Sequence, residues 1–299
     1  MFVRVQVHAV NKSTGGRNSV MKKWLYNLVA AIIVSICVVE AVPAYAGTFR
    51  RAHTNASWDI KERTVGGAVF RSGTYNNGTW TLYATYKGKT TLLSSTADGG
   101  TVISDGRIVY YAAKKNSKWY AYKWDLKTGK CKKLVKLASH PHLVDLEGYY
   151  NGFLYYILDN PVGTLKKVSL STKKSKTVRK DATGTDWTGR YFVIYDGTGA
   201  GYSYIDALDC KKGKLRTIVK FPAIWVTTNK YVYYVEVIKG DQWELLAGKN
   251  VTANIKRYTL SSGKRKTILN NIRMKKIMEF DSKHIKYVNQ KNAVKTKKW

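Results

Sequence analysis

The stretch that decides the fold begins Ile108-Val109-Tyr110-Tyr111, continues through Trp119-Tyr120-Ala121-Tyr122 and turns at Thr128-Gly129-Lys130. Aromatic and β-branched residues fit a pleated, half-buried surface, so the first two runs predict strands. The glycine supplies the positive φ that a tight hairpin needs. A short apolar run after the turn, Leu134-Val135, predicts a further strand.

This phrase recurs about every 40 residues between positions 66 and 270. Its first run occurs at Ala68-Val69-Phe70, Ile108-Val109-Tyr110-Tyr111, Phe153-Leu154-Tyr155-Tyr156, Tyr191-Phe192-Val193-Ile194-Tyr195 and Tyr231-Val232-Tyr233-Tyr234. Its turn occurs at Lys87-Gly88-Lys89, Thr128-Gly129-Lys130, Thr172-Lys173-Lys174, Lys212-Gly213-Lys214 and Ser262-Gly263-Lys264. A strand-rich repeat of this length indicates small sheets that bury their apolar faces only by stacking. We therefore expect an all-β chain folded as a six-bladed β-propeller, with five blades as the alternative and a β-sandwich as the competing architecture.

The chain after residue 270 predicts one more, incomplete copy. Two strands are expected at residues 277–280 and 284–288, followed by Ala293-Val294-Lys295, and no fourth strand follows. Residues 47–54 are expected to supply that strand, because an exchange between the two ends would leave no open sheet edge.

The repeated motifs resemble those of secreted TolB-like and YWTD-like bacterial propellers, a group of unassigned function. The matching elements are the hydrophobic strand ending in Tyr-Tyr, the strand Trp124-Asp125-Leu126 and the turn Thr128-Gly129-Lys130. The resemblance covers residues 48–299 and implies a binding or scaffold role more than catalysis. It brings no set of functional residues.

The N-terminal region predicts export. Met21-Lys22-Lys23 is a positively charged start, an apolar run follows, and Ala44-Tyr45-Ala46 fits the cleavage rule for signal peptides. We expect residues 1–20 to be a start-site extension, residues 21–46 a signal peptide and residues 47–299 the propeller domain, with an uncleaved anchor as the alternative. Only Cys131 and Cys210 follow residue 46, and two free thiols are expected in a secreted or envelope-associated protein of a Gram-positive-type bacterium.

The chain is strongly basic, with 52 Lys and Arg against 19 Asp and Glu and a net charge of +33. Removing residues 1–46 leaves a net charge of +29, far beyond the magnitude of roughly 2–8 that solubility requires. The cations gather at the repeated turns, so we expect a cationic rim with Lys130, Lys132, Lys174, Lys214, Lys264 and Arg265 as binding residues. The expected partner is an anionic cell-wall polymer or a membrane surface rather than a specific nucleic-acid sequence, and the protein is expected to be a monomer.

Catalytic motifs are missing from the sequence. It has no Gly-x-Ser-x-Gly and no His-Glu-x-x-His, and no catalytic residue, metal ligand or cofactor is predicted. His140-Pro141-His142 is interpreted as a loop between blades rather than a metal site, and Asp186-Trp187 is expected in a loop. The alternative function is a carbohydrate-active enzyme, a lyase or glycoside hydrolase, with acidic residues at the propeller centre.

The fifth copy carries an insertion at residues 238–250, about twice as long as the equivalent segments. Insertions in repeat proteins map to loops on one face, which is often the binding face. We expect this loop opposite the basic turns, with Trp243, Asp241 and Glu244 contacting a protein or glycan ligand.

Overall fold

The computed structural model describes residues 49–53, 63–76, 79–97, 101–139, 143–158, 163–198 and 201–299. The predicted start-site extension, signal peptide and His140-Pro141-His142 segment lie outside these residues. Within the described ranges, no helix is long and apolar enough to cross a membrane.

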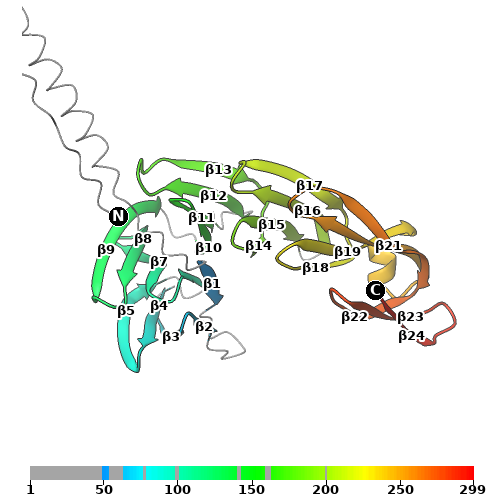
Figure 1. The fold of residues 1–299 in the computed structure, drawn as a ribbon, viewed down its shortest axis with the longest axis horizontal. Helices are drawn as coiled ribbons and strands as arrows, with labels where there is room; N and C mark the ends of the chain where they lie inside the picture. Colours follow the sequence, from blue (N-terminus) through cyan, green and yellow to red (C-terminus); the bar gives the residue numbers. More distant parts are fainter. Residues whose placement is uncertain are drawn as a thin grey trace, which may run out of the picture. The chain divides into compact units, whose positions relative to one another are not determined.

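The described residues form successive antiparallel sheets in chain order (Figure 1). The first set comprises β2 (Arg63–Val65), β3 (Ala68–Asn76), β4 (Thr79–Tyr86) and β5 (Lys89–Ala97). The second comprises β6 (Thr101–Ser104), β7 (Ile108–Lys115), β8 (Lys118–Asp125) and β9 (Lys130–Ala138). A pairing of Ala97 with Ala113 joins both sets into one nine-stranded sheet that also includes β1 (Arg50–His53).

Three four-stranded sheets follow the nine-stranded sheet, and a three-stranded sheet comes last. The four-stranded sheets are β10 (Val144–Tyr150), β11 (Phe153–Leu158), β12 (Thr164–Ser169), β13 (Ser175–Arg179); β14 (Gly184–Trp187), β15 (Tyr191–Thr198), β16 (Gly201–Asp209), β17 (Lys214–Lys220); and β18 (Ile224–Thr227), β19 (Tyr231–Lys239), β20 (Val251–Thr259), β21 (Arg265–Met274). The last holds β22 (Lys276–Phe280), β23 (His284–Val288) and β24 (Val294–Lys298). The first strands of neighbouring sheets lie together, since β6 contacts β10, β10 contacts β14 and β18 contacts β22. This succession of antiparallel sheets, with the first strands in contact, is the blade arrangement of a β-propeller, so the predicted all-β propeller class is confirmed. The number of six blades stays a prediction.

The N-terminal strand corrects one prediction. β1 was expected to complete the last sheet, but it pairs antiparallel with β6, with Arg50 opposite Ser104 and His53 opposite Thr101. Among the described residues, β24 is paired with β23 alone. The inner edge of β6 accepts β1 because β6 is only four residues long and fully buried, so it needs cover on its free side.

The repeated tyrosine pair holds successive blades together. In β7 the Tyr111 hydroxyl donates to the Leu93 carbonyl of the preceding outer strand, 2.9 Å away. In β11 the Tyr156 hydroxyl donates in the same way to the Leu137 carbonyl, 3.3 Å away. These rings are buried, so their hydroxyls need a partner, and the partner lies in the neighbouring blade. This contact explains the second tyrosine of the pair in these two copies.

The repeated turns have the backbone geometry that the glycines predict. Gly88, Gly129, Gly213 and Gly263 all have φ between 63° and 76°. The third copy has no glycine, and there Lys173 takes φ 62°. A side chain in this conformation costs about 1–2 kcal/mol relative to the right-handed region, so Lys173 carries local strain.

Candidate functional site

Each four-stranded sheet has two distinct ends. We call the end that carries the turns after the first and the third strand the hairpin end, and the opposite end the linker end. Backbone hydrogen bonds tie the two turns of the hairpin end together: Leu126 N donates to Arg107 O over 2.9 Å, Cys210 N to Arg190 O over 3.1 Å and Leu260 N to Lys230 O over 3.0 Å. Leu170 N donates in the same way to Gly152 O over 2.9 Å, and Trp299 N to Lys283 O over 3.0 Å. The same connection therefore repeats in five successive blades, and corresponding side chains share one end.

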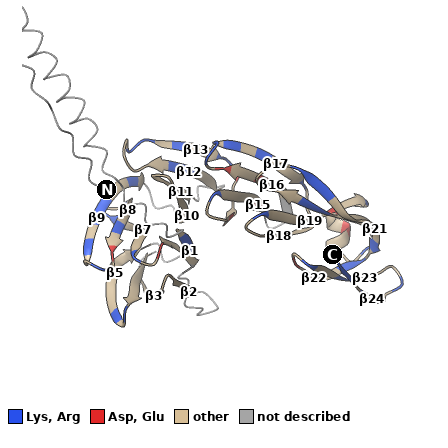
Figure 2. Cartoon of the chain, viewed as in Figure 1, with Lys and Arg blue, Asp and Glu red and all other residues tan. Residues whose placement is uncertain are grey.

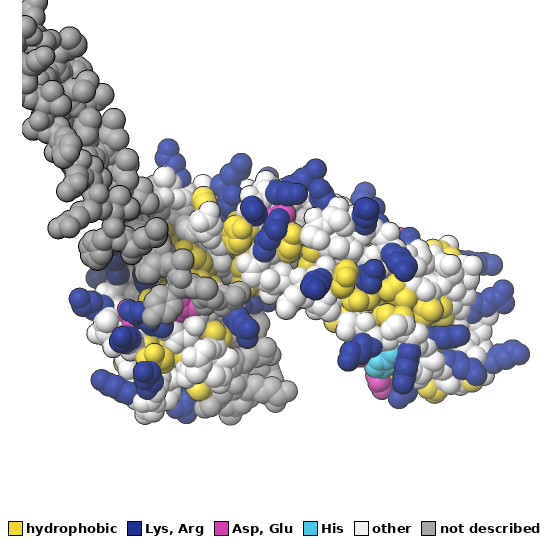
Figure 3. Space-filling model, viewed as in Figure 1, with side chains coloured by type: hydrophobic (Ala, Val, Ile, Leu, Met, Phe, Trp, Pro, Cys, Tyr) yellow, Lys and Arg dark blue, Asp and Glu magenta, His cyan; other side chains and the backbone are white. Residues whose placement is uncertain are grey.

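The outer strands and hairpins carry many of the Lys and Arg residues of the domain (Figure 2). Each of β5, β9, β13, β17 and β21 contains Lys or Arg, and none contains Asp or Glu. Of the residues predicted to bind, Lys130, Lys132, Lys174, Lys214 and Lys264 are exposed. We call these five residues the lysine rim. Figure 3 shows Lys and Arg spread over this side of the described surface with few acidic side chains beside them.

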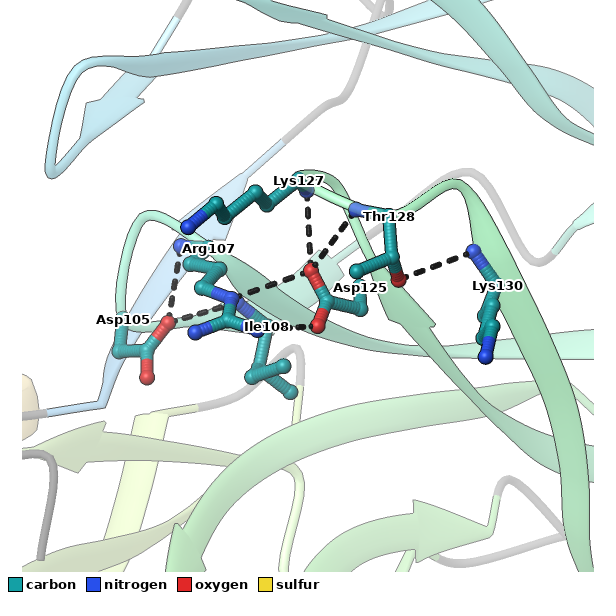
Figure 4. Close-up of polar contacts among 7 residues, drawn as sticks. All are labelled: Asp105, Arg107, Ile108, Asp125, Lys127, Thr128 and Lys130. Atoms are coloured by element: carbon teal, nitrogen blue, oxygen red, sulfur yellow. Dashed lines mark hydrogen bonds and ion pairs between the residues drawn. The ribbon is translucent and has the colours of Figure 1, made fainter. Parts of the chain in front are cut away.

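Acidic residues at the hairpin end are occupied by structural contacts (Figure 4). The Arg107 guanidinium donates from Nε and Nη2 to the two oxygens of Asp125, over 3.1 and 2.6 Å. Asp125 also accepts the backbone N–H of Lys127 over 2.9 Å. The hydrogen bond from Arg107 holds the pKa of Asp125 below its ordinary value. The acid is thus neutralised within the blade, and the exposed lysines keep their charge for other partners.

Two arginines near the rim connect neighbouring blades. Arg265, predicted as a binding residue, donates from Nη2 to Thr217 O over 2.9 Å and from Nε to Ile218 O over 3.2 Å. Arg216 donates from the neighbouring strand to Ser262 O over 3.4 Å. The guanidinium of Arg265 therefore joins β21 to β17. The sequence pattern had grouped Arg265 with the lysines and did not predict this contact between blades.

The fifth-blade insertion lies at the linker end, opposite the lysine rim of the same sheet, as expected from its position between β19 and β20. It contains a short helix, α2 (Gln242–Leu246), where the sequence had suggested only a loop. Asp241 and Glu244 form a capping box, in which each side chain accepts the other residue's backbone N–H. These two predicted ligand-contacting acids therefore fix the helix start.

The helix buries one side and exposes the other. Gln242 and Leu245 are each 4% exposed, whereas Trp243 is 44% and Leu246 is 66% exposed. Phe221 and Ile238, which lie in or beside linker-end segments, are also exposed. Exposed apolar groups of this size are able to contact another molecule. Ligand contact by Trp243 stays a prediction, and its exposed position is consistent with it.

A cavity of about 990 Å³ lies among the inner strands at the hairpin end. Its walls include Arg50 and Arg51 from β1 and residues from β14, β15 and β18. The lining side chains of most interest are Asp186, Trp187, Tyr195, Trp225, Thr227 and Asn229. The sequence pattern missed this site because the inner strands are only four residues long and carry no repeated phrase. Asp186 and Trp187, expected in a loop, belong to β14.

A buried ionic network adjoins the cavity. Glu147 on β10 contacts the Arg51 guanidinium and accepts from the Thr185 hydroxyl over 2.5 Å. Burial raises the pKa of Glu147 to about 7, although Arg51 and Thr185 act in the opposite direction. Because Glu147 is only 5% exposed and Arg51 covers it, this carboxylate secures β1 and β14 to β10.

Two carboxylates of the inner strands have identified partners. Asp186 accepts from the Thr227 hydroxyl over 2.6 Å, which links β14 to β18, and Glu147 is held by Arg51. No group of three or more His, Cys, Asp or Glu among the residues in the described ranges could hold a metal ion. Cys131 is exposed and Cys210 is half-buried, and both are free thiols. Burial raises the pKa of Cys210 to about 12, so its thiol stays protonated at neutral pH.

Comparison with known proteins gives structural neighbours alone. No family model and no curated protein matches the chain. TolB from Acinetobacter baumannii is 13% identical, with a TM-score of 0.37 over 71% of this chain and 54% of that one, so the chain covers about half of that TolB. A putative TolB from Agrobacterium tumefaciens is 11% identical, with a TM-score of 0.34 over 64% of this chain and 78% of that one. An oligogalacturonate lyase in complex with manganese is 11% identical, with a TM-score of 0.44 over 82% of this chain and 73% of that one.

TolB structures are among those that the chain resembles. The TM-scores lie below 0.5, so no property of this chain is derived from these neighbours. The activity of the chain has to be argued from its own residues.

Proposed function

We propose that this chain is an exported, non-catalytic binding propeller of a bacterial cell envelope. Its hairpin end attracts an anionic surface polymer, and its linker end, with α2, presents a surface to a protein partner. The proposal rests on the outer strands, which carry Lys or Arg in every complete blade and no acid at all.

The charge distribution favours a polymer over a small ligand. The lysine rim extends over four blades, at Lys130, Lys132, Lys174, Lys214 and Lys264, and these side chains are exposed. Separate blades hold the cations apart, so a long polyanion can contact several at once, whereas a small anion meets only one or two. Each contact is weak and screened by salt, and the summed attraction depends strongly on ionic strength.

Two observations support binding over catalysis. Asp125 and Asp209, the acids beside the rim, are each held by an arginine, at 2.6 and 2.7 Å. Glu147 is covered by Arg51, so Asp125, Asp209 and Glu147 do not form an acid–base pair for catalysis.

Sedimentation with isolated cell walls tests this function. The wild-type domain is mixed with walls at low and high salt beside a quadruple variant, Lys130→Glu, Lys174→Glu, Lys214→Glu and Lys264→Glu. All four side chains are exposed, so the variant is expected to keep its thermal unfolding temperature. We expect the wild type to sediment at low salt and to be released at high salt, and the variant to stay in solution at both. Equal retention of the two proteins would refute the proposal.

A further inference from the structure

The cavity at the hairpin end has an aromatic corner. The rings of Trp225 on β18 and Tyr195 on β15 lie 5.0 Å apart between centroids, at 51° to one another. Both rings line the cavity of about 990 Å³. Trp187 adds a third aromatic wall, with its Nε1 donating to Phe49 O over 3.3 Å.

Two glycines make room for these rings. A Cβ at Gly184 would lie 2.5 Å from Cζ of Tyr195, so only glycine allows this ring to lie over β14. A Cβ at Gly148 would lie 3.0 Å from Cδ2 of Trp187. Both rings are therefore fixed by close contact with bare backbone, and a ligand would meet preformed aromatic walls.

Polar groups stand beside the aromatic corner. One carboxylate oxygen of Asp186 accepts from Thr227, and its other oxygen has no partner among the described residues. Arg50 and Asn229 are exposed, and no described residue pairs with either side chain. The cavity thus combines an acceptor, a cationic donor and an amide that both donates and accepts.

We propose that this cavity binds a pyranose ring of an envelope glycan. The inference rests on the proposed function, because it identifies the unit of the polymer that the hairpin end would recognise. A pyranose has apolar C–H faces that pack on aromatic rings and hydroxyls that both donate and accept hydrogen bonds. The volume lies at the upper end of the range of roughly 300–1,000 Å³ that is usual for ligand sites, which is enough for more than one sugar.

The same groups argue against a site for phosphate alone. Anion sites gather several cations or backbone N–H groups. Here Arg51 is engaged by Glu147, Asp186 adds a negative charge, and Arg50 is the one cation of the lining without a partner among the described residues. A polyanion without sugar is therefore expected to contact the lysine rim and not the cavity.

Tryptophan fluorescence with defined oligosaccharides tests the proposal. The probes are tetrasaccharides of N-acetylglucosamine, of glucose and of alternating glucuronate and N-acetylglucosamine, with sugar-free poly(glycerol phosphate) as the fourth. At least one tetrasaccharide is expected to change the fluorescence of the wild type. Trp225→Ala is expected to weaken that binding at least about tenfold, as for the loss of one stacked ring with its contacts. Trp80→Ala is the matched control, because this tryptophan lies on β4 and does not line the cavity, and it is expected to bind as the wild type does.

Three results would overturn the proposal: no response to any tetrasaccharide up to about 10 mM, unchanged binding by Trp225→Ala, or equal loss in Trp80→Ala. If Trp225→Ala fails to fold, the exposed Asn229→Ala and Arg50→Gln carry the same test. The quadruple variant of the lysine rim separates this proposal from the proposed function. It is expected to keep its affinity for the tetrasaccharide while losing retention on walls. The tetrasaccharide assay therefore tests the pyranose site, and the sedimentation assay tests the proposed function.

Discussion

Arg107 and Asp125 form a bidentate ion pair that closes the hairpin end of one blade, and Arg190 and Asp209 repeat it two blades later. In both pairs the arginine comes directly before the second strand and the aspartate ends the third. Each aspartate also accepts backbone N–H groups of the following turn, at Lys127 and at Lys211. These two aspartates therefore shape the basic hairpins, while Lys127 and Lys211 remain exposed.

Asp125→Asn should lower the free energy of unfolding by about 1 kcal/mol at pH 7, because a partly exposed bidentate pair loses its charge. The pKa of Asp125 is lowered in the folded state, so its contribution is present above the unfolded value of about 3.9 and is lost as the pH falls through the folded value. Urea unfolding at pH 7 and at pH 3 should therefore show a difference between the variant and the wild type that shrinks at low pH. A difference of the same size at both pH values would exclude the ion pair as its cause.

Lys173→Gly should raise the free energy of unfolding by about 0.5–1 kcal/mol, because glycine takes positive φ without the strain that a side chain has there. Gly213→Lys is the reciprocal change, at φ 63° in the next blade, where a Cβ would meet nothing within 4 Å. It should destabilise by about the same amount, since its cost is conformational. Thermal unfolding of both variants measures this, and changes of equal sign would contradict the interpretation.

Glu147 should make the domain less stable as the pH rises from about 4.5 to about 7. Burial raises its pKa to about 7, so the folded state holds a proton that the unfolded state has released in this window. Glu147→Gln cannot release that proton, and its unfolding free energy should vary less with pH over the same window. Denaturant titrations at half-unit intervals compare the slopes, and parallel curves for the two proteins would show that Glu147 does not titrate there.

Substitutions in helix α2 and at its N-cap should differ in their effect on stability. Leu245→Ala should cost about 2–4 kcal/mol because Leu245 is buried, whereas Trp243→Ala should change stability by less than about 0.5 kcal/mol. Asp241→Ala removes the capping box and should cost about 1 kcal/mol. Chemical unfolding ranks the three, and a large loss of stability in Trp243→Ala would assign this ring to packing rather than to a partner.

The repeated phrase was sufficient to predict the second, third and fourth strands of the blades, because Tyr111 and its equivalents must bury rings at a fixed spacing. It also predicted the three strands of the last sheet and the positive φ of the turns. The partner of β1 could not be predicted, since pairing with β6 depends on an edge that exists only after the chain has folded. The short inner strands carry no periodic pattern, and the cavity that they line was missed with them.

The positions of the basic residues were easier to predict than the hydrogen-bond partners of single side chains. The sequence located the basic turns, but it could not show that Arg265 donates to backbone carbonyls of the neighbouring blade, whereas Lys264 beside it makes no such contact across the blades among the described residues. In the same way, the sequence prediction did not include the helix cap that Asp241 and Glu244 form, and their contact with a ligand stays a prediction. Such roles depend on which backbone groups lie near, and residue type alone does not determine them.

The salt dependence of binding to purified poly(glycerol phosphate) tests the central claim most directly. A polyanion that displaces counterions gives an affinity that falls linearly with salt on logarithmic axes, with a slope set by the number of charges engaged. The wild type is predicted to show a steep slope, and the quadruple variant of the lysine rim a much shallower one with weaker binding at low salt. Equal slopes for the two proteins, or an affinity of the wild type that does not change with salt, would contradict the account.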